Sequence, residues 1–339
     1  WILDDLTALR RWITSVAGER SRLFPPRAAY RTQFGGGGGG DDEAPRNVGK
    51  NPPDGVMVDY WLKDKPGEKD SVSIQIYSGG DLLRTFTTRK PVKPADLKEK
   101  AEGVERDRDR EKPLEPAAGV NRFVWDMRIL KPTLAPKAVF NEGTHAPPHV
   151  GAGTYRVKLT VNGKADSASF EVKPNPAGNA TAEDLKAQFD LLIAIRDRLS
   201  ESHVAVMTIR DVRAQAAEIG DRAERLGRGD ALKTRARTLG EKLGKIELMI
   251  TNPDIKALED DLNFEPKLDH DFAYLAGVVG GADRRPTAAS LRIYDQLVSR
   301  LAAIRAELKA VLDGDLSDFN RAVAASGMPA VVGSPKIQR

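Results

Sequence analysis

The chain has 339 residues, of which 40% are hydrophobic and 30% are charged. At roughly 150 residues per domain, this length predicts about two domains and excludes a single small module held together by disulfides or metals. No run approaches the roughly 20 apolar residues of a membrane helix. The 53 basic and 49 acidic residues leave a net charge of +4, which is weak support for nucleic-acid binding. Because the chain has no cysteine, disulfides, thiolate nucleophiles and cysteine-built zinc sites are excluded.

The first 34 residues indicate the end of a larger structure followed by a connector. The chain opens on Trp1 rather than on methionine, and residues 1–7 form a largely apolar run typical of the last strand of a sheet. No basic segment leads into an apolar stretch, so no signal peptide can be identified. A missing upstream portion would explain both features. Phe24-Pro25-Pro26 then favours an extended connector over residues 20–34.

Six consecutive glycines at positions 35–40 precede the acidic residues 41–43. Such a run has high backbone entropy and predicts a flexible linker over residues 35–50. A phosphate-binding loop is the alternative. That alternative is disfavoured because no Lys-Ser or Lys-Thr pair follows the glycines.

Alternation of apolar and polar residues predicts β-structure over residues 51–175. The alternation or a short apolar run is found at 56–62, 72–76, 82–87, 122–125, 154–161 and 167–172. Asn162-Gly163 between the last two runs is a strong hairpin signal, because a type I′ turn needs positive φ at both central residues. We therefore expect about seven short strands in an antiparallel, immunoglobulin-like β-sandwich.

Two further features of this region have alternative interpretations. Residues 98–112 carry six basic and six acidic side chains, which indicates a solvated loop or short helix rather than a partner-binding arm. His145 and His149 have a spacing of four, which would suit a metal pair on a helix. Pro147 and Pro148 exclude a helix there and no third ligand is evident, so no metal or other cofactor is predicted.

From residue 179 onward the apolar period becomes helical. Thr181-Ala182-Glu183-Asp184 is similar to a capping box and predicts a helix start. Apolar residues then recur at helical spacing over 185–226, 232–250 and 291–311. The three stripes predict an antiparallel three-helix bundle over residues 179–326, followed by a C-terminal tail over 327–339.

The sequence offers few candidate functional residues. His203 lies on the apolar stripe of the first helix, where a buried imidazole with one satisfied nitrogen is favoured over a catalytic base. A basic cluster that includes Arg222, Arg225 and Arg228 is the one candidate anion-binding patch, although it has too few aromatic neighbours for nucleic acid. Trp61 and Tyr77 are candidate contact residues, with burial against the helices as the alternative.

Short segments distributed in order along nearly the whole chain resemble one known family. The segments are Trp1-Ile2-Leu3-Asp4-Asp5-Leu6-Thr7, Leu23-Phe24-Pro25-Pro26-Arg27, Asn121-Arg122-Phe123-Val124-Trp125-Asp126-Met127-Arg128, Gly153-Thr154-Tyr155, Gln188-Phe189-Asp190, Leu262-Asn263-Phe264, Gly277-Val278-Val279 and Arg285-Pro286-Thr287-Ala288. Together they resemble the region that follows the β-propeller in sortilin-like, BNR-repeat secreted proteins, which are often labelled glycosyl hydrolases or sialidase-like. The resemblance implies that residues 1–7 are the last propeller strand and that the parent protein is secreted or located in the cell envelope.

The resemblance carries over no catalytic residue. The chain contains no Ser-x-Asp-x-Gly-x-Thr-Trp repeat, and its adjacent carboxylates are pairs in sequence only. We therefore expect a noncatalytic binding and structural region whose partners are its own upstream propeller and a protein or glycan. Two alternatives stay open. The first is part of a glycosyl hydrolase whose active site lies on the propeller, and the second is a scaffold protein that associates through its helices.

Overall fold

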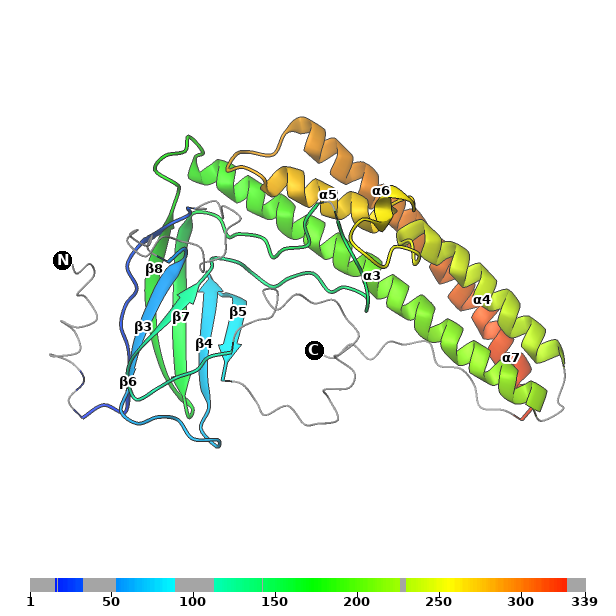
Figure 1. The fold of residues 1–339 in the computed structure, drawn as a ribbon, viewed down its shortest axis with the longest axis horizontal. Helices are drawn as coiled ribbons and strands as arrows, with labels where there is room; N and C mark the ends of the chain where they lie inside the picture. Colours follow the sequence, from blue (N-terminus) through cyan, green and yellow to red (C-terminus); the bar gives the residue numbers. More distant parts are fainter. Residues whose placement is uncertain are drawn as a thin grey trace.

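The computed structural model describes residues 16, 18–32, 53–88, 113–141, 143–225 and 230–327. Over these residues the chain forms two β-sheets followed by helices, an α+β architecture. The sheets lie at one end of the molecule, and the helices extend away from them as a long arm (Figure 1). The expectations for residues 1–7, 35–40 and 98–112, for Arg228 and for the tail from 328 lie outside the described residues.

The first sheet has three antiparallel strands in the order β1-β3-β6. Val56, Val58, Tyr60 and Leu62 of β3 are all buried, as their alternation predicts. The bounds are β1 (Ser21–Leu23), β3 (Val56–Leu62) and β6 (Gly119–Trp125).

The second sheet has five strands in the order β2-β8-β7-β4-β5, with only β2 parallel to its neighbour. The hairpin predicted at Asn162-Gly163 is confirmed between β7 and β8, and a second hairpin joins β4 and β5. Asn162 and Gly163 have φ of 49° and 84°, the left-handed values that their turn requires. The bounds are β2 (Ala29–Tyr30), β4 (Val72–Ser78), β5 (Asp81–Thr87), β7 (Gly153–Val161) and β8 (Lys164–Lys173).

Both sheets contribute side chains to one hydrophobic cluster. Trp125 of β6 is fully buried within it, and its ring lies 5.9 Å from that of Tyr155 and 6.1 Å from that of Phe170. Edge-to-face aromatic contacts of this kind add to the burial of apolar area. The two sheets are therefore held by a common core.

The arm is built on the long helix α3 (Ala182–Arg225), whose 44 residues span about 66 Å at 1.5 Å per residue. The predicted capping box is confirmed. The Asp184 amide donates to Thr181 Oγ1 at 3.1 Å, and the Thr181 amide donates to Asp184 Oδ2 at 3.1 Å. Helix α3 has buried residues along its whole length, because the other helices pack against it.

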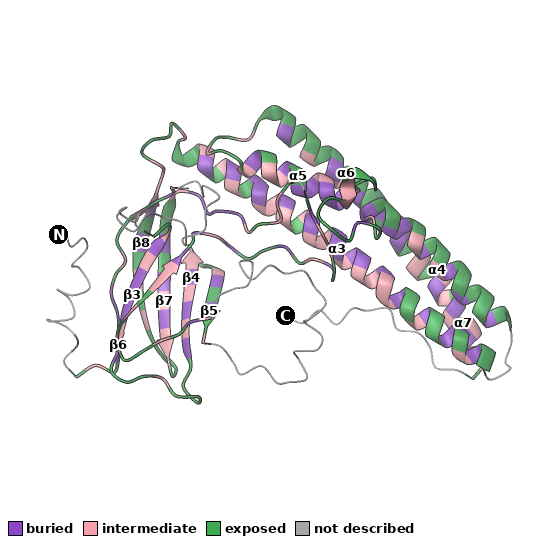
Figure 2. Ribbon diagram, in the orientation of Figure 1, coloured by how far each residue is buried: buried purple, intermediate pink, exposed green. Residues whose placement is uncertain are grey.

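The second and third predicted helices are confirmed as α4 (Asp230–Ile250) and α6 (Ala288–Val311). Helix α6 begins after Thr287, which accepts a hydrogen bond from the Ser290 amide, and it continues through a π-helical turn (Leu312–Leu316) into α7 (Ser317–Ala325). A short 3₁₀ turn (Asp260–Leu262) lies between α4 and the next helix. Figure 2 shows buried residues on the facing sides of these helices and exposed residues outside.

The prediction of only three helices was incomplete, because α5 (Leu268–Gly280) packs between α3 and α6. Its apolar residues do not form one stripe, and Lys267 at its N-cap makes no capping hydrogen bond through its side chain. Both sequence signals for a helix are therefore weak here. Among the described helices, none is both long and apolar enough to cross a membrane.

Candidate functional site

The two predicted aromatic contact residues lie in different sheets. Trp61 of β3 and Tyr77 of β4 are each half-buried. The Tyr77 hydroxyl donates to Gln75 Oε1 at 3.1 Å, and the Arg156 guanidinium lies 4.7 Å from the centre of the Tyr77 ring. Tyr77 is thus engaged by neighbours in its own sheet, and the structure does not bring it together with Trp61.

The predicted arginine patch lies at the far end of α3, away from the sheets (Figure 1). Arg222 is half-buried, and its Nε has no hydrogen-bond partner among the described residues. Arg225 is exposed, whereas Arg228 lies outside the described residues. The acidic neighbour Glu224 forms an ion pair with Lys233 at 2.6 Å, so the patch is of mixed charge, as the sequence indicates.

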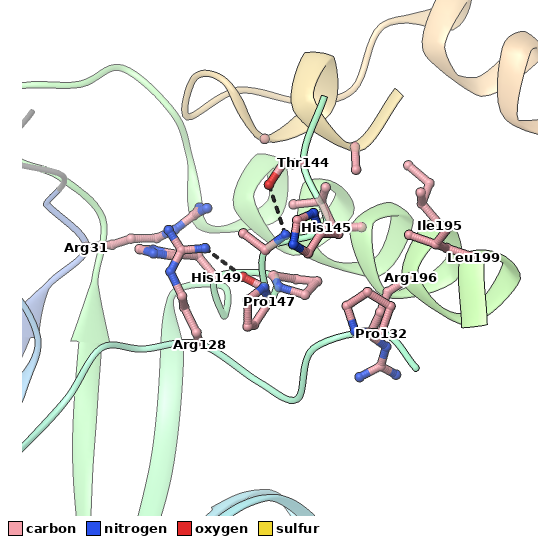
Figure 3. A pocket seen from close by; sticks show the side chains of 15 residues that line it. Arg31, Arg128, Pro132, Thr144, His145, Pro147, His149, Ile195, Arg196 and Leu199 are labelled. Carbon is pink, nitrogen blue, oxygen red and sulfur yellow. Dashed lines mark hydrogen bonds between the residues drawn. The ribbon is translucent and has the colours of Figure 1, made fainter. Parts of the chain in front are cut away.

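A cavity of about 160 Å³ lies where the sheets meet the helices, and we call it the junction pocket (Figure 3). Four parts of the chain form it: the connector after β2, the segment from β6 to β7, helix α3 and helix α5. Its lining residues are Arg31, Arg128, Pro132, Thr144, His145, Ala146, Pro147, Pro148, His149, Leu192, Ile195, Arg196, Leu199, Ala276 and Gly280.

Backbone pairing places Arg128 beside His149. The two residues form an isolated antiparallel bridge, with the Val150 amide donating to Met127 O at 2.8 Å and the Ile129 amide donating to Pro148 O at 3.1 Å. Paired residues of this kind lie side by side on one face. Arg128 Nη1 also donates to Pro147 O at 2.6 Å (Figure 3).

Arg31 enters the same pocket from the end of the five-stranded sheet. Its amide donates to Lys173 O at 2.8 Å, which extends the pairing of β2 with β8. Its side chain is only 2% exposed. Nη2 donates to Gln188 Oε1 at 2.9 Å, and Nη1 lies 3.3 Å from Asp283 Oδ1. Arg31 Nε and Nη1 have no acceptor with hydrogen-bond geometry among the described residues.

Gln188 holds this buried guanidinium in place. The Gln188 side chain is completely buried on α3, and its Nε2 donates to Val279 O and Ala282 O, both at 2.7 Å. One amide thereby joins the sheet connector, α3 and the end of α5. A buried charge is tolerated only with partners of this kind.

The charges around the pocket do not cancel. Arg31 and Arg128 contribute two positive charges, Asp283 compensates one of them, and the exposed Asp126 carboxylate acts on Arg128 from outside the buried groups. Burial lowers the pKa of both arginines, and burial followed by repulsion from Arg128 and Arg31 lowers the pKa of His149 to about 3. His149 is therefore neutral near pH 7, and the buried groups retain one net positive charge.

The opposite side of the pocket is apolar. Leu192, Ile195 and Leu199 lie at intervals of three and four on one face of α3, and all three are buried. Arg196 at the same side forms an ion pair with Asp197 at 2.5 Å, so its charge is balanced locally. The pocket thus combines a cationic end with a hydrocarbon wall.

The segment 143–149 is pressed against α5. The Thr144 amide donates to Ala273 O at 2.8 Å, and a Cβ atom on Gly143 would lie 2.4 Å from the Ala273 carbonyl carbon and from the Tyr274 amide nitrogen. Gly143 also has φ of 79°. Only glycine fits both the left-handed backbone and the close approach, and this contact fixes one side of the pocket.

The two remaining histidines, His203 and His270, are buried, and their rings lie 5.8 Å and 4.9 Å from that of Phe140. His203 Nδ1 accepts from the Ala135 amide at 3.2 Å, while His203 Nε2 has no hydrogen-bond partner in the described part of the chain and lies 3.8 Å from Asp269 Oδ2. The prediction of a buried imidazole with one satisfied nitrogen is confirmed. His270 Nδ1 lies 2.9 Å from Asp269 Oδ1. The pKa of His203 is lowered to about 4, and burial of the imidazole is the largest cause.

Sequence reasoning named His145 and His149 only as a metal pair, and it missed Arg31 and Arg128 as site residues. Both histidines do line the junction pocket. Over the described part of the chain, no group of three or more histidine, aspartate or glutamate residues has an arrangement that would hold a metal ion. One signal in the sequence was the basic surplus of residues 120–150, where four Lys and Arg accompany two acidic residues.

Comparison with models of known protein families and with curated proteins finds no match to this chain.

Proposed function

We propose that this chain is a noncatalytic binding and structural region of a secreted β-propeller protein of the sortilin-like, BNR-repeat kind. The observation that supports this best is the buried polar joint between the sheets and the helical arm. Arg31, Gln188 and the carbonyl groups of Val279 and Ala282 are connected there by hydrogen bonds of 2.7–2.9 Å. A joint of this kind makes the chain suitable as a rigid support that holds a binding surface at a fixed distance.

Segments that suggested the resemblance meet at this joint. Gln188 belongs to one of them and Val279 to another. Arg285, from a third, forms an ion pair with Asp184 in the first turn of α3 at 2.7 Å. In the proposed parent protein, these short motifs are therefore those that fasten the β-region to the helices.

We infer that the two sheets form an immunoglobulin-like sandwich. Their common hydrophobic cluster around Trp125 supports this, as does the antiparallel pairing of all strands except β2 with β8. The sandwich corresponds to residues 51–175 and the helical region to residues 179–326. Loops at the end of the sandwich then contact the upstream propeller and a protein or glycan partner outside the cell or in the envelope.

Mass spectrometry and amino-terminal sequencing of the native polypeptide test this proposal. We expect a parent substantially heavier than the 37.0 kDa of this chain, with a propeller upstream of Trp1. We also expect the isolated chain to hydrolyse no member of a panel of aryl glycosides. A native polypeptide that begins at Trp1 would exclude the proposed parent. Hydrolysis by the isolated chain would instead make it an enzyme.

A second candidate function, assembly through the helices, is favoured by exposed apolar side chains. Leu291 and Ile293 on α6 are 48% and 46% exposed, and Tyr274 and Val278 on α5 are 57% and 42% exposed. Side chains of this kind favour association between copies. Sedimentation equilibrium of the chain and of an Ile293→Lys variant separates the two functions, since assembly requires a wild-type mass above that of the monomer and a monomeric variant.

A further inference from the structure

We propose that the junction pocket binds a small organic monocarboxylate, or the carboxylate end of a larger molecule, with the carboxylate held by Arg31 and Arg128 and the hydrocarbon part against α3. This inference concerns the chain itself and does not depend on the parent protein proposed above. It is carried by one side-chain arrangement, in which a buried arginine with unpartnered N–H groups lines a cavity beside a second arginine.

The donors of Arg31 point to an oxyanion. Arg31 is 2% exposed, and its Nε and Nη1 have no hydrogen-bond acceptor among the described residues. A buried donor left unpaired is costly. The unpartnered Nε–H and Nη1–H of Arg31 point in different directions, because the donor parallel to Nε–H is on Nη2, so a carboxylate takes one hydrogen bond from Arg31 rather than a bidentate pair. Asp283 occupies one direction from Nη1 at 3.3 Å, so a ligand adds to this ion pair rather than replaces it.

Arg128 supplies the second positive group. Its Nη1 donates to Pro147 O, and the exposed carboxylate of Asp126 accepts from the Arg128 backbone amide at 3.1 Å. Among the described residues, the Asp126 carboxylate attracts the Arg128 guanidinium without forming an ion pair or hydrogen bond with it. Arg128 thus lines the cavity with a guanidinium that has no ion pair among the described residues (Figure 3).

The net charge selects a monoanion. Asp283 compensates Arg31, the exposed Asp126 partly compensates Arg128, and neutral His149 adds no charge, so the two arginines keep at most one positive charge. One negative charge on the ligand balances this, whereas a phosphate dianion would bring an uncompensated charge into a partly buried site. The charge count therefore favours a carboxylate over inorganic phosphate.

The shape selects an organic ligand. Leu192, Ile195 and Leu199 form a buried hydrocarbon wall opposite the arginines. The cavity of about 160 Å³ is close in size to the roughly 150 Å³ that accepts benzene in an engineered apolar cavity. A short carboxylic acid fits this volume with its charged end at the arginines and its carbon atoms at α3.

Isothermal titration calorimetry with sodium propionate tests the proposal. We expect saturable binding to the intact chain with a dissociation constant of about 1 mM or lower. Propionamide has the same shape without the charge and should bind at least about tenfold more weakly. Inorganic phosphate should also bind more weakly than propionate. The proposal is overturned by absence of propionate binding, by equal binding of propionamide, or by tighter binding of phosphate.

Two variants with the same charge change locate the site. Arg128→Gln should weaken propionate binding by about tenfold or more. Arg300→Gln removes an exposed arginine that pairs with Asp271 at 2.7 Å outside the pocket, and it should bind propionate like the wild type. Equal loss in both variants would show nonspecific charge attraction and overturn the assignment.

A measurement on the wild-type chain covers the case in which Arg128→Gln does not fold. Propionate should shift the NMR signals of the Arg31 and Arg128 Nε–H groups and leave that of Arg300 unchanged. Unchanged Arg31 and Arg128 signals at a propionate concentration that saturates the heat signal would place the bound carboxylate elsewhere. Neither NMR outcome depends on the mass or the glycosidase activity of the native protein, so the two proposals fail separately.

Discussion

At the scale of single residues, the most consequential side chain is Gln188. It is uncharged and lies on an apolar helix face, yet it supplies the acceptor for a buried guanidinium and two donors to backbone carbonyl groups. Each of these bonds crosses between parts of the chain that are far apart in sequence. Removal of this one amide therefore leaves buried polar groups on the connector and at the end of α5 without a hydrogen-bond partner.

Gln188→Leu should lower the free energy of unfolding by about 3 kcal/mol or more, because it leaves Arg31 Nη2 and two carbonyl oxygens without this partner. Urea unfolding followed by circular dichroism measures the change. Gln215→Leu is the matched control, since Gln215 is half-buried on the same helix and donates to Asp211 at 2.9 Å. Its cost should not exceed about 1 kcal/mol, and similar costs for the two variants would refute the importance of the joint.

Two buried histidines predict acid sensitivity. The pKa of His203 is lowered to about 4 and that of His149 to about 3, both below the ordinary value of 6.5. Below pH 6.5 the unfolded chain therefore binds more protons than the folded chain. Stability is fully present above this pH and is lost as pH falls toward the folded values, by about 1.4 kcal/mol per pH unit for each histidine.

Chemical unfolding between about pH 6.5 and pH 5 isolates this effect, because most carboxylates titrate lower. His203→Asn keeps an acceptor for the Ala135 amide and removes the titrating group. In this variant, the slope of the free energy of unfolding against pH should fall by the contribution of one histidine. A slope equal to that of the wild type would show that His203 does not titrate differently in the folded and unfolded states.

Sequence patterns identified His203 as buried but not Arg31. A histidine on a helical apolar stripe is buried by the stripe itself, which is local information. Arg31 stands in a proline-containing connector, and its burial depends on Gln188 and Asp283, which lie more than 150 residues away. Nothing in the sequence of the connector itself indicates that Arg31 is buried.

At the scale of elements, the pocket depends on how closely segment 143–149 approaches α5. Gly143 and Gly163 both have left-handed φ, at 79° and 84°. They differ in their surroundings, because a Cβ on Gly143 would lie 2.4 Å from the backbone of α5, whereas a Cβ on Gly163 has no atom within 4 Å. Substitutions at the two glycines therefore separate the cost of left-handed backbone strain, which both share, from the cost of steric conflict, which only Gly143 has.

Gly143→Ala should destabilise the chain by about 3 kcal/mol or more and weaken propionate binding, because segment 143–149 must move away from α5. Gly163→Ala should cost only about 1 to 2 kcal/mol, from left-handed strain alone, and leave binding unchanged. Thermal unfolding and calorimetry measure both effects. Equal costs would mean that the contact with α5 adjusts without penalty.

Elements with one dominant local pattern could be predicted. Alternation and the Asn-Gly turn were sufficient for β7 and β8, and the capping box with its apolar stripe was sufficient for α3. Helix α5 was missed because its apolar residues surround the helix and no capping side chain announces it. The junction pocket was missed because its residues come from four separate segments that only the tertiary fold brings together.

At the scale of the whole molecule, the sheets and the arm should behave as one body. The chain has no cysteine, so cysteines introduced at exposed Leu82 on β5 and exposed Arg237 on α4 can carry spin labels selectively. We expect a single narrow distance distribution in double electron–electron resonance. Gln188→Leu should broaden it and Gln215→Leu should not, whereas a broad distribution in the unsubstituted labelled chain would refute a rigid joint.

The length of α3 makes the joint a fulcrum. Gln188 lies in the second turn, and about 55 Å of helix separates it from Arg225 at the far end. A rotation of about 5° at the joint would move that end by about 5 Å while atoms beside Gln188 move by tenths of an ångström. Because the junction pocket lies beside the joint, such a rotation changes its geometry very little. A partner that pulls on the Arg225 end of α3 exerts its largest torque on the hydrogen bonds of Gln188.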